Sequence, residues 1–564
     1  MNKETIILDI AGMTCDHCAT GIEQLLSKNE GISECKVSYQ NGVGECSFDP
    51  SKTSKEEIIN SINETKNYKA QVTEEEDCCS VESNSEIAKK TSNKTNSFDL
   101  IIIGGGSAAF SAAIKAESLG LSTLMINGGL DFGGTCVNVG CVPSKNLIRA
   151  GETAYHARHS NFESIKPKGV DIDFKQLIKD KKKLVATLQE KKYMDVVSDF
   201  ENLTMLTGWA EFKDSKTVIV DGKTEYSALK FIIATGATTN IPTIEGLNEI
   251  GYLTNVSLFD LEEKPENITI MGAGYIGLEI AMAYNRLGVK VRIIEFTDRV
   301  LRTQTPDISE ALETQMRKER IEVLPNFRAV KFEKKGNDTI IHCKYPDGSF
   351  TQIIEKGKVV VATGTKPNTQ KLGLQNIGLE LDKTGHILVN EKMETNLPTI
   401  YAVGDVTNTP AFVYTAAFEG KIAVENAFLG ATNKADYTSL PWVVFTDPQI
   451  AGAGLDETQA EAQNISFEVS KIELKDVPRA IAANDTRGFI KLIRNTETDK
   501  LIGARIVAPE GGELIQQLSM AIKYGITVKD LAESFYPYLT LGEGIKLAAI
   551  TFGKDVYKLS CCAS

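Results

Sequence analysis

Two glycine-rich turns constrain the fold of this 564-residue chain more than any other feature of its sequence. Each turn follows a short apolar run and precedes a segment whose apolar residues have helical spacing. The positions are Gly104, Gly105, Gly106 and Ala109 in the first unit, and Gly272, Gly274 and Gly277 in the second. Glycine is needed because the backbone bends sharply and lets a pyrophosphate approach the amides at the helix N-terminus. The sequence therefore predicts two dinucleotide-binding units in α/β domains.

The strand ends in the two units indicate which dinucleotide each one binds. The second strand of the first unit ends in Asn127, where an acidic residue is usual, but an amide can still accept and donate hydrogen bonds at a ribose. The matching strand of the second unit ends in Glu295, whose carboxylate can accept two ribose hydroxyls and would repel a 2′-phosphate. A later strand ends in Gly404-Asp405, which is well placed to hold a ribityl chain. We predict FAD in the first unit and a nicotinamide dinucleotide in the second.

A cysteine pair lies after the first unit, in the segment GGTCVNVGCVPSKNLI. The spacing of Cys136 and Cys141 predicts that both sulfurs lie on one side of the first turns of a helix. A thiol at a helix N-terminus loses proton affinity because the helix dipole favours the thiolate. Thiolates attack disulfides, bind soft metals or exchange electrons with a flavin. A buried structural pair is the alternative, and the flanking glycines and Lys145, which could lie near the flavin, argue against it.

These motifs occur in the order found in a known family. From Phe98 to the C-terminus the chain resembles the flavin-dependent disulfide reductases. The resemblance implies an FAD domain, an inserted nicotinamide domain, a C-terminal dimerisation domain and an active site completed by the partner subunit. It also implies an ion pair between Lys145 and Glu279 beside the flavin. The residues assigned to cofactor binding are Gly104, Gly105, Gly106, Ala109, Gly134, Thr135, Lys145, Thr235, Gly236, Gly272, Gly274, Gly277, Glu295, Gly364, Gly404 and Asp405.

Residues 1–72 contain a second cysteine pair on a different framework. The order of strand and helix patterns is βαββαβ, which predicts a ferredoxin-like fold. The loop Gly12-Met13-Thr14-Cys15-Asp16-His17-Cys18 resembles the metal site of heavy-metal-associated domains. A four-ligand zinc site would need a second pair at ligand spacing, which Cys35 and Cys46 do not offer. Like Cys343, each of these two is expected to be a small buried hydrophobe.

The C-terminal segment PYLTLGEGIKLA departs from the disulfide-reducing members of the family, which carry His-Pro-x-x-x-Glu there. Glu543 is retained, but Tyr538 replaces the histidine, and a phenol with a pKa near 10 does not readily shuttle protons at neutral pH. Residues 387–564 contain no histidine that could substitute. The tail instead presents Cys561-Cys562, and thiolates select soft metals. An incidental pair in a frayed tail is the alternative.

Together these departures resemble the mercury(II)-reducing branch of the family, to which Tyr275 and the partner subunit's Tyr538 also conform. The resemblance implies that mercury(II), bound as a dithiolate, is reduced to elemental mercury. The catalytic residues would be Cys136, Cys141, Tyr275, Tyr538, Lys145, Glu279 and Glu543. The ion would come from mercury(II)–thiol complexes or a mercury transporter and would be bound in turn by Cys15, Cys18, Cys561, Cys562, Cys136 and Cys141. Cys78-Cys79 is either a relay on a tether or a chance pair.

Domain boundaries and setting follow from composition and pattern. We expect a heavy-metal-associated domain at 1–72, a flexible linker at 73–97, an FAD domain at 98–245 and 366–436, a nicotinamide domain at 246–365 and a dimerisation domain at 437–564. The net charge of −13 argues against nucleic-acid or membrane partners. No stretch is long and apolar enough for a membrane span or a secretory signal, so we expect a cytoplasmic homodimer.

Two questions stay open in the sequence. The resemblance implies NADPH as electron donor, whereas Glu295 favours NADH, and Arg299 and Arg302 lie near enough to receive a 2′-phosphate; we expect NADH to be accepted. The rival functions are a dihydrolipoamide dehydrogenase or glutathione reductase with a metal-sensing appendage, and a copper or zinc metallochaperone that keeps its own thiols reduced. Metal-dependent oxidation of the nicotinamide would separate the three.

Overall fold

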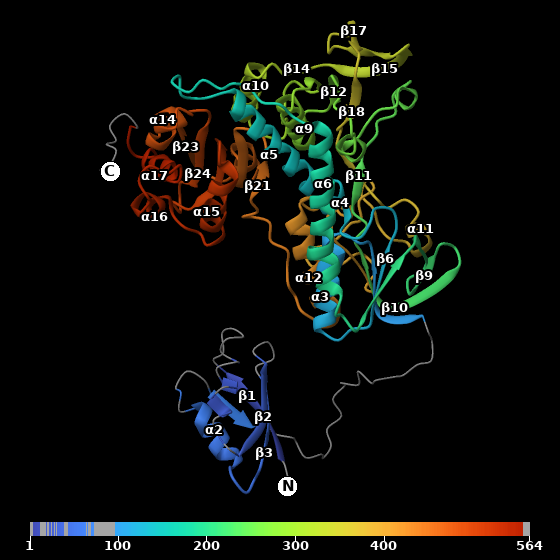
Figure 1. Ribbon diagram of the computed structural model, residues 1–564, viewed down its shortest axis with the longest axis vertical. Helices are drawn as coiled ribbons and strands as arrows, with labels where there is room; N and C mark the ends of the chain where they lie inside the picture. The colour runs from blue at the N-terminus through green and yellow to red at the C-terminus, as the bar shows by residue number, and fades with distance from the viewer. Residues whose placement is uncertain are drawn as a thin grey trace. The chain divides into compact units, whose positions relative to one another are not determined.

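The computed structural model describes residues 4–11, 19, 22–23, 25–27, 29, 31–38, 43–63, 65, 69–72 and 96–555. The chain divides into two compact units, Met1–Asn93 and Lys94–Ser564 (Figure 1). Cys15, Cys18, Cys78, Cys79, Cys561 and Cys562 lie outside the described residues.

The first unit is a four-stranded antiparallel sheet in the order β2-β3-β1-β4. The strands are β1 (Glu4–Ala11), β2 (Ile32–Ser38), β3 (Val43–Phe48) and β4 (Lys69–Val72), with helix α2 at Lys55–Asn63. The described residues between 19 and 26 are also helical. Alternate residues of β1 enter one core with Ile22, Leu26 and Ile58, because side chains along a strand alternate between faces. The predicted ferredoxin-like fold is confirmed.

The prediction that Cys35 and Cys46 are unpaired was wrong. The two residues lie directly opposite each other on β2 and β3 and form a disulfide. The hairpin register places them together because Ser38 pairs with Val43, which makes positions 35 and 46 equidistant from the turn. Cys343 is buried as expected, and burial raises the pKa of its thiol to about 11.

The second unit begins with the domain that the sequence predicts to bind FAD. Its seven-stranded sheet has the order β7-β6-β5-β10-β9-β8, with β20 beside β10. The strands are β5 (Ser97–Ile103), β6 (Thr123–Asn127), β7 (Leu203–Thr207), β8 (Ala210–Asp214), β9 (Thr217–Val220), β10 (Thr224–Ile233) and β20 (Ile400–Ala402). Helices α3 (Ser107–Ser118) and α12 (Val413–Phe428) lie side by side (Figure 1). They approach closely because Gly420 has no side chain, and a Cβ there would lie 2.3 Å from the Ala108 carbonyl oxygen.

The nicotinamide domain is a second doubly wound unit inserted between β10 and β20. Its parallel sheet has the order β14-β13-β12-β18, formed by β12 (Asn267–Met271), β13 (Lys290–Ile294), β14 (Glu322–Leu324) and β18 (Lys358–Val361). Its helices are α8 (Asn255–Phe259), α9 (Tyr275–Arg286) and α10 (Pro306–Lys318). An antiparallel sheet of β15 (Arg328–Lys335), β16 (Asp338–Lys344) and β17 (Phe350–Glu355) adjoins it. The two crossovers between domains pair as β11 (Ala237–Thr239) and β19 (Thr365–Pro367).

The C-terminal domain is a five-stranded antiparallel sheet with helices. Its order is β21-β22-β25-β24-β23, formed by β21 (Trp442–Val444), β22 (Gln449–Gly454), β23 (Phe467–Glu473), β24 (Phe489–Asn495) and β25 (Leu501–Ala508). The helices are α13 (Glu457–Ala462), α14 (Pro478–Ala482), α15 (Gly511–Lys523), α16 (Val528–Glu533) and α17 (Glu543–Ile550). The remaining α-helices of the second unit are α4 (Gly134–Asn138), α5 (Cys141–Arg158), α6 (Phe174–Gln189), α7 (Asp195–Val197) and α11 (Leu374–Ile377).

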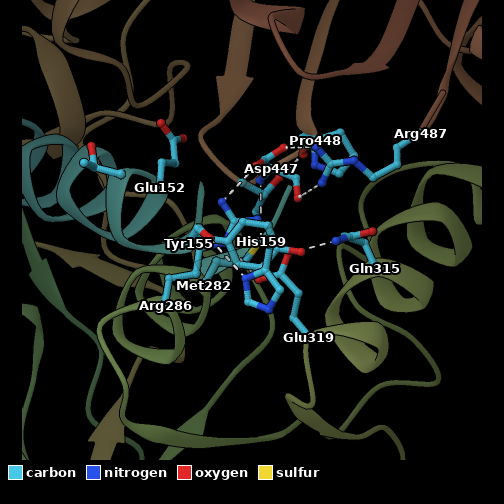
Figure 2. A network of polar contacts seen from close by, with 12 residues as sticks. Glu152, Tyr155, His159, Met282, Arg286, Gln315, Glu319, Asp447, Pro448 and Arg487 are labelled. Carbon is cyan, nitrogen blue, oxygen red and sulfur yellow. Dashed lines mark hydrogen bonds and ion pairs between the residues drawn. The ribbon is translucent and has the colours of Figure 1, made fainter. Parts of the chain in front are cut away.

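A buried ionic network joins α5, the nicotinamide domain and the C-terminal domain (Figure 2). The Arg286 guanidinium donates to Glu319 at 2.6 and 2.8 Å and to Asp447 at 2.8 Å. Asp447 also accepts from Arg487 at 2.8 Å, and Arg286 lies 4.2 Å from the centre of the Tyr155 ring. The arginine side chain is 1% exposed, so its charge is compensated by these carboxylates and not by water. The network fixes the far end of the helix that carries Cys141.

Candidate active site

The two candidate redox cysteines lie on consecutive helices. Cys136 is in α4 and Cys141 is the first residue of α5, so the predicted arrangement on one helix was wrong. The break occurs at Gly140, where a Cβ would lie only 2.8 Å from the Thr135 carbonyl oxygen. Both cysteines are half-buried and neither forms a disulfide. The short α4 and the glycine turn bring their thiols together at the N-terminus of α5.

The two thiols have opposite proton affinities. A hydrogen bond from the Cys136 thiol and the positive charge of Lys145 lower the pKa of Cys141 to about 7, although burial opposes this. The same hydrogen bond, together with burial, raises the pKa of Cys136. At pH 7 Cys136 therefore keeps its proton, whereas about half of the Cys141 thiols are ionised.

Lys145 connects the redox helix to the nicotinamide domain. Its Nζ lies 2.7 Å from a Glu279 carboxylate oxygen and 4.6 Å from the centre of the Phe445 ring. The other oxygen of Glu279 accepts a hydrogen bond from the Phe445 amide at 3.0 Å. Glu279 is 6% exposed, so the carboxylate is fixed by α5 on one side and by the C-terminal domain on the other.

Two tyrosines that were not predicted as site residues, Tyr193 and Tyr414, lie near the cysteine pair. The Tyr193 hydroxyl lies 2.9 Å from Ser107 Oγ, at the first glycine turn, and burial raises its pKa. Burial, Tyr275 and the Cys141 thiolate raise the pKa of Tyr414, whose hydroxyl donates to the Pro441 carbonyl. No local pattern marks these tyrosines, because each reaches the site through tertiary contacts alone.

The first glycine turn and Asp405 fit FAD. Gly104 has a φ of +133°, and a Cβ there would lie 2.2 Å from the Ala234 carbonyl oxygen, so only glycine can occupy the position. Asp405 follows β20, and burial raises the pKa of its carboxyl. When bound, FAD supplies two-electron transfer between a nicotinamide and the cysteine pair.

Other residues assigned to the flavin have identifiable places. Gly105 adjoins the Asn127 side chain, whose amide donates to Leu130 O at 2.8 Å. Gly134 lies against Gly106, since a Cβ at 134 would be 2.6 Å from the Gly106 Cα. Ala109 is buried in α3, Thr135 is in α4, Thr235 donates to Asn368 O at 2.9 Å, and Gly236, Gly364 and Gly404 all have positive φ. Thr235, Gly236 and Gly364 thus lie at the crossovers between domains.

The second glycine turn has the same construction as the first. A Cβ at Gly272 would lie 2.4 Å from the Ala362 carbonyl oxygen, and one at Gly277 would lie 2.1 Å from Gly272 O. Gly274 is the N-cap of α9 and leaves the helix N-terminus open to a pyrophosphate. Both turns therefore satisfy the steric conditions for dinucleotide binding.

Glu295 has a role beyond the predicted ribose contact. Its carboxylate accepts hydrogen bonds from the Ala273 amide at 2.7 Å and from the Thr297 amide and hydroxyl at 2.8 and 2.9 Å. It therefore holds the glycine turn in place. Arg299 and Arg302 both pair with Asp298, at 3.2 and 2.9 Å.

The C-terminal candidates lie on an exposed apolar segment. Phe535 is fully exposed, and Tyr538 and Leu539 are 53% and 43% exposed. Glu543 begins α17, is buried, and accepts a hydrogen bond from the Leu539 amide at 3.3 Å. Among the described residues, no group of three or more metal-ligating side chains is present, and no helix is long and apolar enough to span a membrane.

Comparison with known proteins decides the family. Residues 98–420 match the pyridine nucleotide-disulphide oxidoreductases, and residues 440–549 match the dimerisation domain of that family. The chain belongs to this family. Residues 7–69 match the heavy-metal-associated domain. The predicted family, fold class and enzyme class are thereby confirmed, and the chain is an oxidoreductase that uses FAD and a nicotinamide dinucleotide.

Similar proteins cover the whole chain. A mercuric reductase of Lysinibacillus sphaericus is 40% identical over 564 residues, and one of Staphylococcus aureus is 38% identical over 565 residues; both matches cover 100% of each chain. Among solved structures, the Cu(II) complex of the HOCl-induced flavoprotein disulfide reductase RclA from Escherichia coli matches with a TM-score of 0.73. That match has 26% identity and covers 81% of this chain and 100% of the other.

Proposed function

We propose that the chain reduces mercury(II) to elemental mercury with electrons from a nicotinamide dinucleotide, as a cytoplasmic homodimer. The single observation that carries this proposal is a cysteine pair with one readily ionised thiol and no histidine to shuttle protons in the C-terminal part of the chain. Cys141 has a pKa of about 7 beside Cys136, whereas residues 387–564 contain no histidine. The full-length similarity to mercuric reductases supports the same metal.

The cysteine pair would take mercury(II) from its carrier thiols by stepwise exchange. The Cys141 thiolate forms the first sulfur–mercury bond as one bond to the carrier breaks. Cys136 loses its proton when it forms the second bond and displaces the second carrier thiol. The nearby Lys145 cation stabilises the negative charge of the thiolates. Two soft sulfur ligands suit this ion, so the pair needs no third protein ligand.

Residues of the partner subunit would complete the site. The match of residues 440–549 to the family's dimerisation domain and the exposed segment around Phe535 support a homodimer. In the dimer, the partner subunit's Tyr538 would assist metal exchange opposite Tyr275. Delivery through Cys15-Cys18 and Cys561-Cys562 belongs to the same proposal.

NADH is the expected donor. Glu295 carries a negative charge where a 2′-phosphate would lie, and its three hydrogen bonds hold it there. The nearest arginines, Arg299 and Arg302, already pair with Asp298. We expect a higher kcat/KM for NADH than for NADPH, and a strong preference for NADPH would show this part of the proposal to be wrong.

The test is anaerobic oxidation of NADH by the holoenzyme with mercury(II) and excess thiol, with mercury vapour measured in parallel. We expect mercury-dependent oxidation with one vapour atom per NADH. C141S should abolish it, and C343S should not, because Cys343 is buried in β16 away from the pair. Oxidised glutathione, oxidised lipoamide and copper(II) serve as alternative acceptors. Absence of mercury-dependent oxidation, or faster turnover of a disulfide, would overturn the proposal.

A further inference from the structure

One row of residues crosses the entire C-terminal sheet. Trp442, Gly452, Arg505, Lys491 and Lys471 lie directly opposite one another on β21, β22, β25, β24 and β23. Directly opposite residues project from the same face of a sheet. The row therefore presents one indole, one gap and three cations on one face.

The row contacts the nicotinamide domain through Trp442 at one end and through Lys491, next to the last residue, near the other. Lys491 is 2% exposed, and its Nζ lies 3.0 Å from an Asp307 carboxylate oxygen and 3.1 Å from the Thr305 hydroxyl. At the other end, the Trp442 ring stacks on Tyr275 with ring centres 5.8 Å apart and 27° between the planes. The sheet thus holds the N-terminus of α10 with charge and the first residue of α9 with an aromatic ring.

The indole of Trp442 fits against β22 because residue 452 is glycine. A Cβ at Gly452 would lie 2.4 Å from Trp442 Cζ2 and 2.6 Å from Cε2. Those distances are well inside van der Waals contact, so any side chain at 452 would push the indole away. Gly452 has an ordinary extended backbone in β22, and its requirement is therefore for space.

The guanidinium of Arg505 also contacts the indole of Trp442. The guanidinium lies 5.5 Å from the centre of the Trp442 ring and is 2% exposed. Nη1 donates to the carbonyl oxygens of Ala453, Gly454 and Ala504 at 3.1, 3.3 and 2.9 Å. A cation fixed by three carbonyls over an aromatic ring restrains that ring.

Tyr275 is the residue that the Trp442 ring restrains by stacking. It follows Gly274 at the N-terminus of α9, and one turn later Glu279 pairs with Lys145. Its hydroxyl accepts a hydrogen bond from Gln304 Nε2 at 3.2 Å, and burial raises its pKa. The phenol therefore lies at the N-terminus of α9, beside the dinucleotide-binding turn and one helical turn before the Lys145–Glu279 pair. A nicotinamide ring that delivers electrons to the site would have to pass close to it.

We propose that Trp442, seated over Gly452 and held by Arg505, is a positioning residue that sets the affinity for the nicotinamide by stacking on Tyr275. The nicotinamide ring displaces the phenol from this stack when it binds. This inference rests on the proposed function only in that a nicotinamide dinucleotide is the electron donor. An aromatic pair of this kind changes an equilibrium by about 2- to 10-fold, and dinucleotide affinity changes by the same factor because only the displaced state binds.

The test compares two variants that break the stack differently. W442L keeps an apolar side chain without a ring. G452A keeps the tryptophan but adds a methyl group in the space that the indole occupies. Both should bind NAD⁺, and NADP⁺ if it binds, about 2- to 10-fold more tightly than the wild type. Their KM for NADH should fall by a similar factor, with kcat within about twofold. A merely structural role predicts lower stability with the wild-type KM.

A spectroscopic readout is available because the chain has two tryptophans, Trp209 and Trp442. Trp209 is 58% exposed, and W209F leaves Trp442 as the single reporter and serves as the matched control for affinity. In W209F holoenzyme, NAD⁺ should change the tryptophan emission, and the change should disappear in W209F/Y275A. Wild-type or weaker dinucleotide affinity in both stack variants, or emission that does not respond to saturating NAD⁺, would overturn the inference. None of these measurements uses mercury, so their failure is distinct from failure of mercury turnover.

Discussion

The ionisation of Cys141 gives the sharpest test of the site's electrostatics. Its pKa of about 7 depends first on the hydrogen bond from the Cys136 thiol and next on Lys145, against the opposing effect of burial. In C136A the donor is absent, so we expect the pKa of Cys141 to return toward the ordinary thiol value of about 8.5. A shift of roughly 1.5 units corresponds to about 2 kcal/mol of lost thiolate stabilisation. K145M should raise the pKa by less.

The sign and size of the effect on reactivity follow from that shift. At pH 7 the thiolate fraction falls from about one half to about 3%, whereas the more basic thiolate is about fivefold more nucleophilic. The alkylation rate at pH 7 should therefore fall only about threefold, but its inflection should move from near pH 7 to near pH 8.5. The assay is iodoacetamide labelling of the reduced holoenzyme, with the Cys141 peptide quantified by mass spectrometry from pH 5.5 to 9.5. The Cys343 peptide should remain unlabelled because that thiol is buried. An unchanged inflection in C136A, or a larger shift in K145M than in C136A, would refute the assignment of causes.

Three further predictions concern other parts of the chain. R286M leaves Glu319 as an uncompensated buried carboxylate and Asp447 with Arg487 as its one remaining cation, so it should lower the free energy of unfolding by about 3–5 kcal/mol in urea titrations. R317M breaks an exposed pair and should cost less than about 1 kcal/mol; equal losses would contradict the role of burial. Y538H should increase oxidised-lipoamide reduction by at least about tenfold because an imidazole restores proton transfer, while Y538F should not. C35S should destabilise the oxidised N-terminal unit by about 3 kcal/mol, since the disulfide spans 11 residues, and the difference should vanish with excess dithiothreitol in hydrogen-exchange measurements.

The nucleotide-binding turns were predictable because their requirements are local. Gly104 and Gly272 adopt positive φ and approach the carbonyls of Ala234 and Ala362 too closely for any side chain. Such a position is visible in the sequence as a glycine between a buried strand and a helix. The parallel sheets follow from the same alternation of strands and helices.

The errors arose where strand register or a single turn decided the outcome. The observed register places Cys35 opposite Cys46, whereas a register shifted by two residues would place it opposite Phe48. Likewise, α4 ends at Asn138 and Gly140 is the N-cap of α5, so Cys136 and Cys141 do not share a helix. Strand register and helix breaks depend on tertiary packing that a single sequence does not display.

The aromatic contacts of the site were beyond sequence reasoning for a different reason. Trp442 and Tyr275 are 167 positions apart, and nothing near either residue indicates that they stack. Only the pairing of Trp442 with Gly452 across two strands explains why an indole fits there. The same holds for Tyr414, which approaches Cys141 from α12.

Proton balance explains why a metal-reducing site can dispense with the histidine that its relatives need. Reduction of a disulfide consumes two electrons and two protons, because both product sulfurs leave as thiols. Reduction of a mercury(II) dithiolate consumes two electrons and no proton, because the products are elemental mercury and two thiolates. Within the described residues, the histidine of α5 nearest in sequence to Cys141 is His156, 15 residues further on and about 22 Å along the helix axis. A subunit with this geometry, and a tyrosine at position 538, supplies electrons readily and protons poorly, which suits the metal and not the disulfide.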